Sequence, residues 1–164
     1  MFDIIVAVNG SNVIGEKSND KYIIPWSNST DMSFFRDMTS VSCPGKRNAV
    51  IMGKNTFLSI PEKNGTRALP KRLNIIISST LEKQEGVLVY PTFSEALKFV
   101  KTCDYIDSVY VIGGAQLYKT ALESEELRLV YINTIEDSAT KHESTNHYIY
   151  FPEIDSSKFE EDTS

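Results

Sequence analysis

Short apolar runs alternate with polar or amphipathic stretches along most of the chain. Runs of four to eight residues rich in Ile, Val and Leu are typical of buried strands. We predict strands at residues 4–8, 48–52, 73–77, 87–90, 108–112 and 127–135. Between them, apolar residues three and four positions apart indicate helices. We predict these helices at residues 29–38, at 56–60, at 94–100 with Ser94 as N-cap, and from after Gly114 to Leu122.

This order of elements predicts an α/β fold with a mostly parallel central sheet and helices on both faces. The run Ile75-Ile76-Ile77 is typical of a strand buried on both faces. We expect a single domain over residues 1–164, because the sequence contains neither an internal repeat nor a linker. Ligands of such sheets bind where the parallel strands end. The loops after Val8, Met52, Ile77 and Ile112 are therefore the places where a site is expected.

Two stretches break the alternation. Residues 11–25 contain Gly15 and a polar run, and we predict a mobile loop there. Residues 136–147 are mostly polar and predict an exposed insertion.

Composition narrows the classes of function. The net charge of −5 argues against a general nucleic-acid binder, whose surface would be basic. No apolar run approaches the ~18 residues of a spanning helix, and the N-terminal segment lacks the basic region of a signal peptide. Cys43 and Cys103 lie far apart, and with only 2 His no metal site is expected. Two free thiols favour a reducing, cytoplasmic location.

An aspartate falls on the apolar face of the first predicted helix. Asp31 shares that face with Phe34, Phe35 and Met38, at offsets of three, four and seven. A carboxylate beside large apolar groups is costly unless it is paired, so a ligand with hydrogen-bond donors would suit it. The alternative is an ordinary helix-start acid, which meets free backbone N–H groups. Taken alone, Asp31 fits that second interpretation more simply.

Three strand-ending loops carry groups that suit phosphate. Gly53-Lys54-Asn55-Thr56 joins a strand to a helix and offers a charge and a hydroxyl. Ser78-Ser79-Thr80 offers three hydroxyls, and Gly113-Gly114 leaves a path without side chains between strand and helix. Each loop alone is equally a plain structural turn. Because all of them would meet at one edge of the sheet, together they predict a site for a dinucleotide and a substrate.

Several motifs then match a known family in order and spacing, across most of residues 2–135. They are Ile5-Val6-Ala7-Val8, Val13-Ile14-Gly15, Pro25-Trp26 with Asp31 and Phe35, Gly53-Lys54-Asn55-Thr56-Phe57 with Ser59-Ile60-Pro61, Leu69-Pro70-Lys71-Arg72 with Asn74, and Val111-Ile112-Gly113-Gly114 with Tyr118. The sequence resembles the dihydrofolate reductases. The resemblance implies a three-layer α/β domain and an enzyme that reduces 7,8-dihydrofolate to tetrahydrofolate with NADPH, for one-carbon metabolism.

The resemblance also implies roles for individual residues. Asp31 would bind the pterin ring and favour protonation of N5, and an apolar pocket raises the pKa of a carboxylate toward the range that this needs. Trp26 would position the water through which the proton reaches N5. Arg72 would pair with the folate α-carboxylate. The implied substrate-binding residues are Ile5, Val6, Asp31, Met32, Phe35, Ile60, Arg72, Ile112 and Asn133.

The implied cofactor site is larger. Its residues are Ala7, Ile14, Gly15, Lys54, Asn55, Thr56, Ser78, Ser79, Thr80, Ile112, Gly113, Gly114, Ala115, Gln116, Leu117 and Tyr118. A cis peptide is implied between Gly113 and Gly114, and residues 13–24 would form a lid over the nicotinamide. The implied partner is a small-molecule substrate, with neither a nucleic acid as substrate nor a membrane. A monomer is expected unless a second domain is fused to the chain.

The sequence departs from the family pattern at several positions. Asn133 stands where a Thr is usual, Gln116 replaces a common Arg or Lys, and Pro91 falls near another usually basic position. Selectivity for NADPH over NADH would therefore depend mainly on Lys54 and on the hydroxyl groups of the strand-ending loops. A final hairpin is not evident after Phe151-Pro152, so the strand at 127–135 is expected at the edge of the sheet.

These departures leave alternatives open. One is a nucleotide-binding homologue with weak or no catalysis. Another is the reductase part of a longer reductase–thymidylate synthase, and a third is a reductase of another pterin or a pyrimidine.

Overall fold

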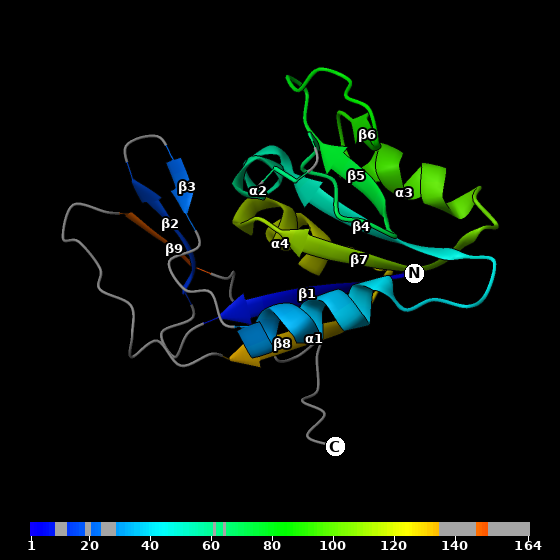
Figure 1. Cartoon of the computed structure of the whole chain (residues 1–164), viewed down its shortest axis with the longest axis horizontal. Coiled ribbons are helices and arrows are strands. Elements are labelled where there is room, and N and C mark those ends of the chain that lie inside the picture. The colour runs from blue at the N-terminus through cyan, green and yellow to red at the C-terminus, as the bar shows by residue number, and fades with distance from the viewer. Residues whose placement is uncertain are drawn as a thin grey trace.

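The computed structural model describes residues 1–8, 13–18, 21–23, 29–60, 62–63, 65–134 and 147–150 (Figure 1). Within these ranges, residues 7–8, 13–18, 21–23, 29–34, 133–134 and 147–150 are described by their backbone alone. Trp26 and the predicted insertion up to residue 146 lie outside the described residues.

The central sheet has six strands in the order β6-β5-β4-β7-β1-β8, and every neighbouring pair is parallel. The strands are β1 Phe2–Val8, β4 Arg47–Gly53, β5 Leu73–Ile77, β6 Val87–Tyr90, β7 Ile106–Gly113 and β8 Leu127–Thr134. All six predicted strands and the predicted α/β class are thus confirmed. Among the described residues, β8 pairs with β1 alone and forms one edge of the sheet.

Helices cover both faces of this sheet because adjacent residues of the central strands are buried on opposite sides. Ile51 and Ile75 pack with helices α3 and α4, whereas Val50 and Ile76 pack with α1 and α2, and all four are fully buried. The bounds of the four helices are α1 Ser29–Ser40, α2 Lys54–Ser59, α3 Phe93–Lys101 and α4 Ala115–Leu122. Consecutive apolar residues in a strand therefore build two cores at once.

Helix α3 begins earlier than the sequence predicts. Its N-cap is Thr92, whose Oγ1 accepts a hydrogen bond from the backbone N–H of Glu95 at 3.2 Å. The prediction of Ser94 as N-cap was wrong, because burial of Phe93 draws the preceding turn into the helix and Thr92 can then satisfy a free N–H.

A second, antiparallel sheet corrects the prediction of a loop over residues 11–25. Strands β2 Val13–Ser18, β3 Lys21–Ile23 and β9 His147–Tyr150 form it in the order β3-β2-β9. The sheet lies beyond the end toward which the arrow of β1 points (Figure 1). The polar pattern gave no sign of strands here, because the partner β9 of β2 lies more than a hundred residues away along the chain and β3 pairs in turn with β2.

An ion pair between a buried carboxylate and a half-exposed arginine joins the edge strand to its neighbour. Asp3 on β1 is 2% exposed and accepts hydrogen bonds from Arg128 Nε at 3.0 Å and Arg128 Nη2 at 2.7 Å. The backbone N–H of Leu129 donates to the same carboxylate at 3.2 Å. The hydrogen bonds to Asp3 raise the pKa of Arg128 above its ordinary value.

The longest helix among the described residues, α1, has 12 residues. None of the described helices therefore reaches the ~20 residues that a bilayer crossing needs.

Candidate active site

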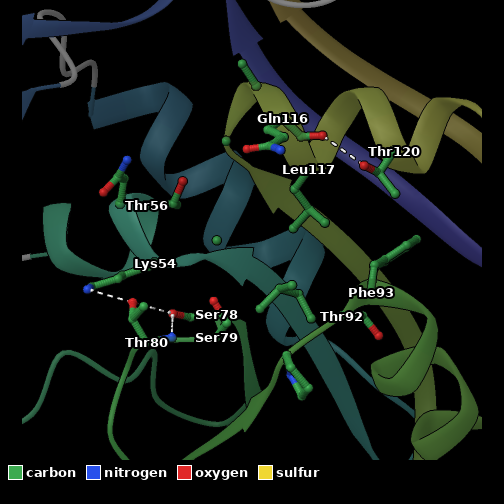
Figure 2. Close-up of a pocket in the computed structure, with 16 residues that line it drawn as sticks. Lys54, Thr56, Ser78, Ser79, Thr80, Thr92, Phe93, Gln116, Leu117 and Thr120 are labelled. Atoms are coloured by element: carbon green, nitrogen blue, oxygen red, sulfur yellow. Dashed lines mark hydrogen bonds between the residues drawn. The ribbon is translucent and has the colours of Figure 1, made fainter.

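A cavity of about 770 Å³ opens where β4, β5, β6 and β7 end (Figure 2). Its wall comes from four segments, each following one of these strands. The lining residues are Gly53, Lys54, Asn55, Thr56, Ile77, Ser78, Ser79, Thr80, Pro91, Thr92, Phe93, Gly114, Ala115, Gln116, Leu117 and Thr120. The predicted meeting of three loops at one edge of the sheet is thereby confirmed, while the loop after Val8 lies outside the described residues.

Polar donors gather on one side of this cavity. Lys54 Nζ donates to Thr80 Oγ1 at 3.1 Å, and Thr80 Oγ1 lies 3.3 Å from Ser78 Oγ. Among the described residues that line the cavity, Lys54 alone carries a charge. Cation and hydroxyls together suit an anionic ligand.

The turn between β7 and α4 requires glycine. Gly113 has φ +130°, and a Cβ there would lie 3.2 Å from Thr56 Oγ1 and 3.4 Å from the Tyr118 hydroxyl oxygen. The peptide between Gly113 and Gly114 is cis, as predicted. This turn brings backbone without side chains against the start of α4, where N–H groups are free to bind an anion.

Helix α4 connects the cavity to the first strand. Gln116, Leu117 and Thr120 line the cavity, and Thr120 Oγ1 donates to the backbone carbonyl of Gln116 at 3.1 Å (Figure 2). Tyr118 is buried, and its hydroxyl donates to the backbone carbonyl of Ile5 at 3.0 Å. Tyr118 therefore fixes α4 against β1 close to the glycine turn.

A buried guanidinium lies outside this cavity. Arg72 is 7% exposed, its Nη1 donates to Thr39 Oγ1 at 2.7 Å, and its Nε donates to the backbone carbonyl of Pro70 at 3.0 Å. Its Cζ lies 6.0 Å from the centre of the Phe35 ring. Burial, and secondarily the Arg36 charge, lower the pKa of Arg72. Among the described residues no carboxylate pairs with Arg72, so within this part of the chain its charged form has no counter-ion.

Four apolar residues predicted to contact substrate share one core cluster, and one of them, Phe35, lies beside Arg72. Phe35, Ile60 and Ile112 pack against one core cluster, to which buried Ile5 belongs. Val6 belongs to the opposite cluster, with α3 and α4, so the structure does not bring its side chain together with the other four. The four clustered residues form an apolar wall on the α1 side of the sheet.

Comparison with known proteins places the chain in a family. Residues 1–164 match the family model described as dihydrofolate reductase. The chain belongs to the dihydrofolate reductase family. A dihydrofolate reductase of Drosophila melanogaster is 33% identical over 138 residues, which cover 82% of this chain and 72% of that protein. The solved structure of Schistosoma mansoni dihydrofolate reductase superposes with a TM-score of 0.76 at 32% identity, covering 96% of this chain and 82% of that one.

Other residues of the reductase pattern are described by their backbone alone. Asp31 and Met32 belong to the first turn of α1, and Asp31 stands four residues before Phe35 on the same helix face. Asn133 on β8 pairs in register with Ala7 on β1, so these two predicted site residues are neighbours in the sheet. Ile14 and Gly15 lie on β2 of the small sheet.

Several residues of the site were not predicted. Thr39 accepts a hydrogen bond from Arg72. The cavity is also lined by Ile77, Pro91, Thr92, Phe93 and Thr120. The rule that ligands bind where parallel strands end applies equally to the loop after Tyr90, and would have identified residues 91–93. The contact with Thr39 depends on how α1 packs, and no local pattern signals it.

Proposed function

We propose that this chain is an enzyme that reduces 7,8-dihydrofolate to 5,6,7,8-tetrahydrofolate with NADPH. Arg72 is the observation that carries the proposal, because a buried guanidinium with no counter-ion among the described residues suits a ligand that brings a carboxylate. Family membership over residues 1–164 supports the same reaction.

The cavity fits the phosphate and adenosine parts of a dinucleotide. Lys54, Ser79, Thr80 and Gln116 offer donors along its wall, and the glycine turn lets the backbone approach a diphosphate. When bound, NADPH supplies the hydride that is added to C6 of the pterin. The lack of further charge among the described lining residues supports Lys54 as the main electrostatic contact.

On the substrate side, Asp31 binds the 2-amino group and a ring N–H of the pterin by paired hydrogen bonds. It also favours addition of a proton to N5, through a water that Trp26 positions. Phe35 and Ile60 pack against the substrate, and Arg72 binds its α-carboxylate by two parallel hydrogen bonds. The apolar cluster around Phe35, Ile60 and Ile112 supports this arrangement, because it can exclude water from the ring.

Product analysis tests the proposed reaction. We expect the purified chain, mixed with dihydrofolate and NADPH, to form tetrahydrofolate and NADP⁺ in equal amounts. If neither product forms above a blank without enzyme, the chain is instead a non-catalytic homologue. Faster turnover of another pterin or a pyrimidine in a mixture with dihydrofolate would refute the proposed substrate.

A second candidate is the same activity within a longer protein. A bifunctional dihydrofolate reductase–thymidylate synthase of Daucus carota is 35% identical over 144 residues, which are 26% of that protein. A reading frame that continues past Ser164 into a synthase would support this candidate, and a stop codon there would refute it.

A monomer in a reducing, cytoplasmic compartment completes the proposal. The free thiols of Cys43 and Cys103 support the reducing compartment.

A further inference from the structure

A buried asparagine on β4 joins the end of α1 to the central sheet. Asn48 is 1% exposed and lies two residues before Val50, on the face of the sheet that α1 covers. Its Nδ2 donates to the backbone carbonyls of Thr39 and Val41, both at 2.9 Å. Its Oδ1 accepts from the backbone N–H of Ser108 on β7 at 3.0 Å. One side chain therefore connects α1, β4 and β7.

These backbone groups lie where regular secondary structure is interrupted. The last four carbonyls of a helix receive no N–H from the helix itself, and Thr39 is the last but one residue of α1. The pairing of β4 with β7 shifts register between Arg47 and Ala49, and the Ser108 N–H lies opposite this shift. Buried backbone groups of this kind need a partner. Asn48 serves both places because an amide donates two hydrogen bonds and also accepts.

The threonine that Asn48 fixes is the one that contacts Arg72. A guanidinium only donates hydrogen bonds, so Thr39 Oγ1 accepts from Arg72 Nη1, at 2.7 Å. The Thr39 hydroxyl donates its own proton to the backbone carbonyl of Phe35 at 2.8 Å. Thr39 is fully buried, so both hydrogen bonds are shielded from water. Asn48 thus holds the backbone of Thr39, while Phe35 sets the direction of its hydroxyl.

The orientation of the Arg72 guanidinium decides how well it can bind a carboxylate. Two parallel N–H···O bonds form only when the planar guanidinium and the carboxylate face each other. A guanidinium that is already held in one plane loses less side-chain entropy when the ligand binds. Thr39 and the Pro70 carbonyl supply that constraint on Arg72.

We propose that Asn48 is a positioning residue for substrate binding, which acts by fixing Thr39 and thereby holding the Arg72 guanidinium ready for the α-carboxylate. This inference rests on the proposed reduction of dihydrofolate by this chain. Because Asn48 acts through Arg72, its effect falls on ligands that carry the carboxylate and not on the pterin ring alone. An asparagine with a merely structural role would affect both kinds of ligand alike.

Steady-state kinetics with two substrates tests this distinction. Dihydrofolate carries the α-carboxylate, whereas 6-methyl-7,8-dihydropterin has the same ring and no carboxylate. We expect Asn48→Ala to raise the KM for dihydrofolate about fivefold at unchanged kcat, roughly the effect of one hydrogen bond, and to change the KM for the dihydropterin by less than about twofold. Asn48→Ser, which keeps one donor, is the milder variant and should raise the KM for dihydrofolate by a smaller factor.

Two variants of Thr39 test the second step of the same relay. Thr39→Val keeps the shape of the side chain and removes the acceptor for Arg72, so we expect it to raise the KM for dihydrofolate alone. Thr39→Ser retains the hydroxyl and should keep the KM of the unmodified chain.

A double-mutant cycle shows whether the effect of Asn48 passes through Arg72. In the Arg72→Leu background, Asn48→Ala should raise the KM for dihydrofolate no further, because the guanidinium that it positions is absent. The matched control is Arg128→Met, which leaves a buried carboxylate unpaired on the other side of the sheet centre, at edge strand β8. It should lower stability and leave both KM values unchanged.

The outcomes separate this inference from the proposed function. If the unmodified chain reduces dihydrofolate but Asn48→Ala shifts the KM of both substrates equally, or of neither, the positioning role of Asn48 is wrong and the proposed function stands. An additive rise in KM in the Arg72→Leu background would also overturn the role. If the unmodified chain reduces neither substrate, the proposed function fails and this inference fails with it.

Discussion

The Arg72 guanidinium is fixed by hydrogen bonds, but among the described residues it has no counter-ion. These hydrogen bonds go to Thr39 and to the carbonyl of Pro70. Burying a charge without a counter-ion costs free energy, and a bound carboxylate would recover part of that cost. Such a site favours ligand binding over the stability of the free protein.

Replacement of Arg72 should therefore separate binding from stability. We expect Arg72→Leu to raise the KM for dihydrofolate at least tenfold, since a buried bidentate pair with the ligand is lost. The melting temperature should stay the same or rise, because an unpaired buried charge is removed. Steady-state kinetics and thermal unfolding measure the two effects, with exposed Arg47→Leu as the control. An unchanged KM would refute the role of Arg72.

Gly113 is constrained by both its backbone angle and its surroundings. Its φ of +130° disfavours any side chain, and an added Cβ would also press on Thr56 and Tyr118. Gly45 has a similar positive φ of +81°, but a Cβ there would meet nothing within 4 Å. Gly45 therefore reports a cost of conformation without contacts, whereas Gly113 adds both a less accessible backbone angle and close contacts.

We predict that Gly45→Ala destabilises the fold by about 1 kcal/mol, and that Gly113→Ala destabilises it by about 2–3 kcal/mol. Denaturant unfolding measures both values. Equal losses at the two positions would contradict the additional cost assigned to Gly113.

At the scale of single residues, the sequence indicated which side chains line the cavity but not which of the site residues are buried. Lys54, Thr80 and Gln116 were predicted at the cavity and line it. The burial of Arg72 follows from the packing of α1 and its Thr39, which no local sequence pattern indicates.

At the scale of elements, local chemistry and burial together set where a helix starts. Two hydroxyl residues, Thr92 and Ser94, compete as the N-cap of α3, and Thr92 makes the cap hydrogen bond to Glu95. Burial of Phe93 decides between them, because the helix must begin there for its side chain to reach the core.

Removing the true cap should cost stability where removing the predicted one does not. We expect Thr92→Ala to lower the free energy of unfolding by about 1 kcal/mol, equivalent to a fall of roughly 2–4 °C in melting temperature. Ser94→Ala, two residues further on, should be neutral within about 0.5 kcal/mol. Thermal unfolding compares the two variants, and the opposite order would contradict the assigned N-cap.

Elements with a strong apolar signal were predictable, and those without it were not. The six strands of the large sheet are rich in Ile, Val and Leu and were all found from the sequence. Strands β2 and β3 of the small sheet are short and carry charged residues, and β2 is paired with β9 from the far end of the chain. The strand conformation of β2 depends on that distant partner more than on its own residues.

For the whole molecule, the edge of the large sheet is a point of weakness. Strand β8 has a sheet partner on one side only among the described residues, and its Leu129 and Ile132 are 40% and 45% exposed. The ion pair between Asp3 and Arg128 compensates by tying the start of β8 to buried β1. Strand order of this kind is a long-range property and was predicted only as far as β8 being an edge.

Breaking this pair should loosen the edge of the sheet. Arg128→Met leaves the Asp3 carboxylate buried with only the Leu129 N–H, and we expect a loss of about 2 kcal/mol, less than the ~3–5 kcal/mol of a fully buried pair because Arg128 is half exposed. Lys101→Ala, which breaks the exposed pair with Glu126, should cost less than about 1 kcal/mol. Urea unfolding ranks the two, and equal effects would argue against a special role for Asp3.

The proposed activity depends on bringing the cavity, the apolar wall and Asp31 of α1 together in one molecule. The most direct test is the rate of NADPH oxidation with dihydrofolate by the unmodified chain and by Asp31→Asn at neutral pH. We predict steady turnover by the unmodified chain and a loss on the order of a hundredfold or more in kcat for Asp31→Asn, since the amide cannot favour protonation of N5. Equal rates for the two proteins, or no oxidation by either, would contradict the proposed function.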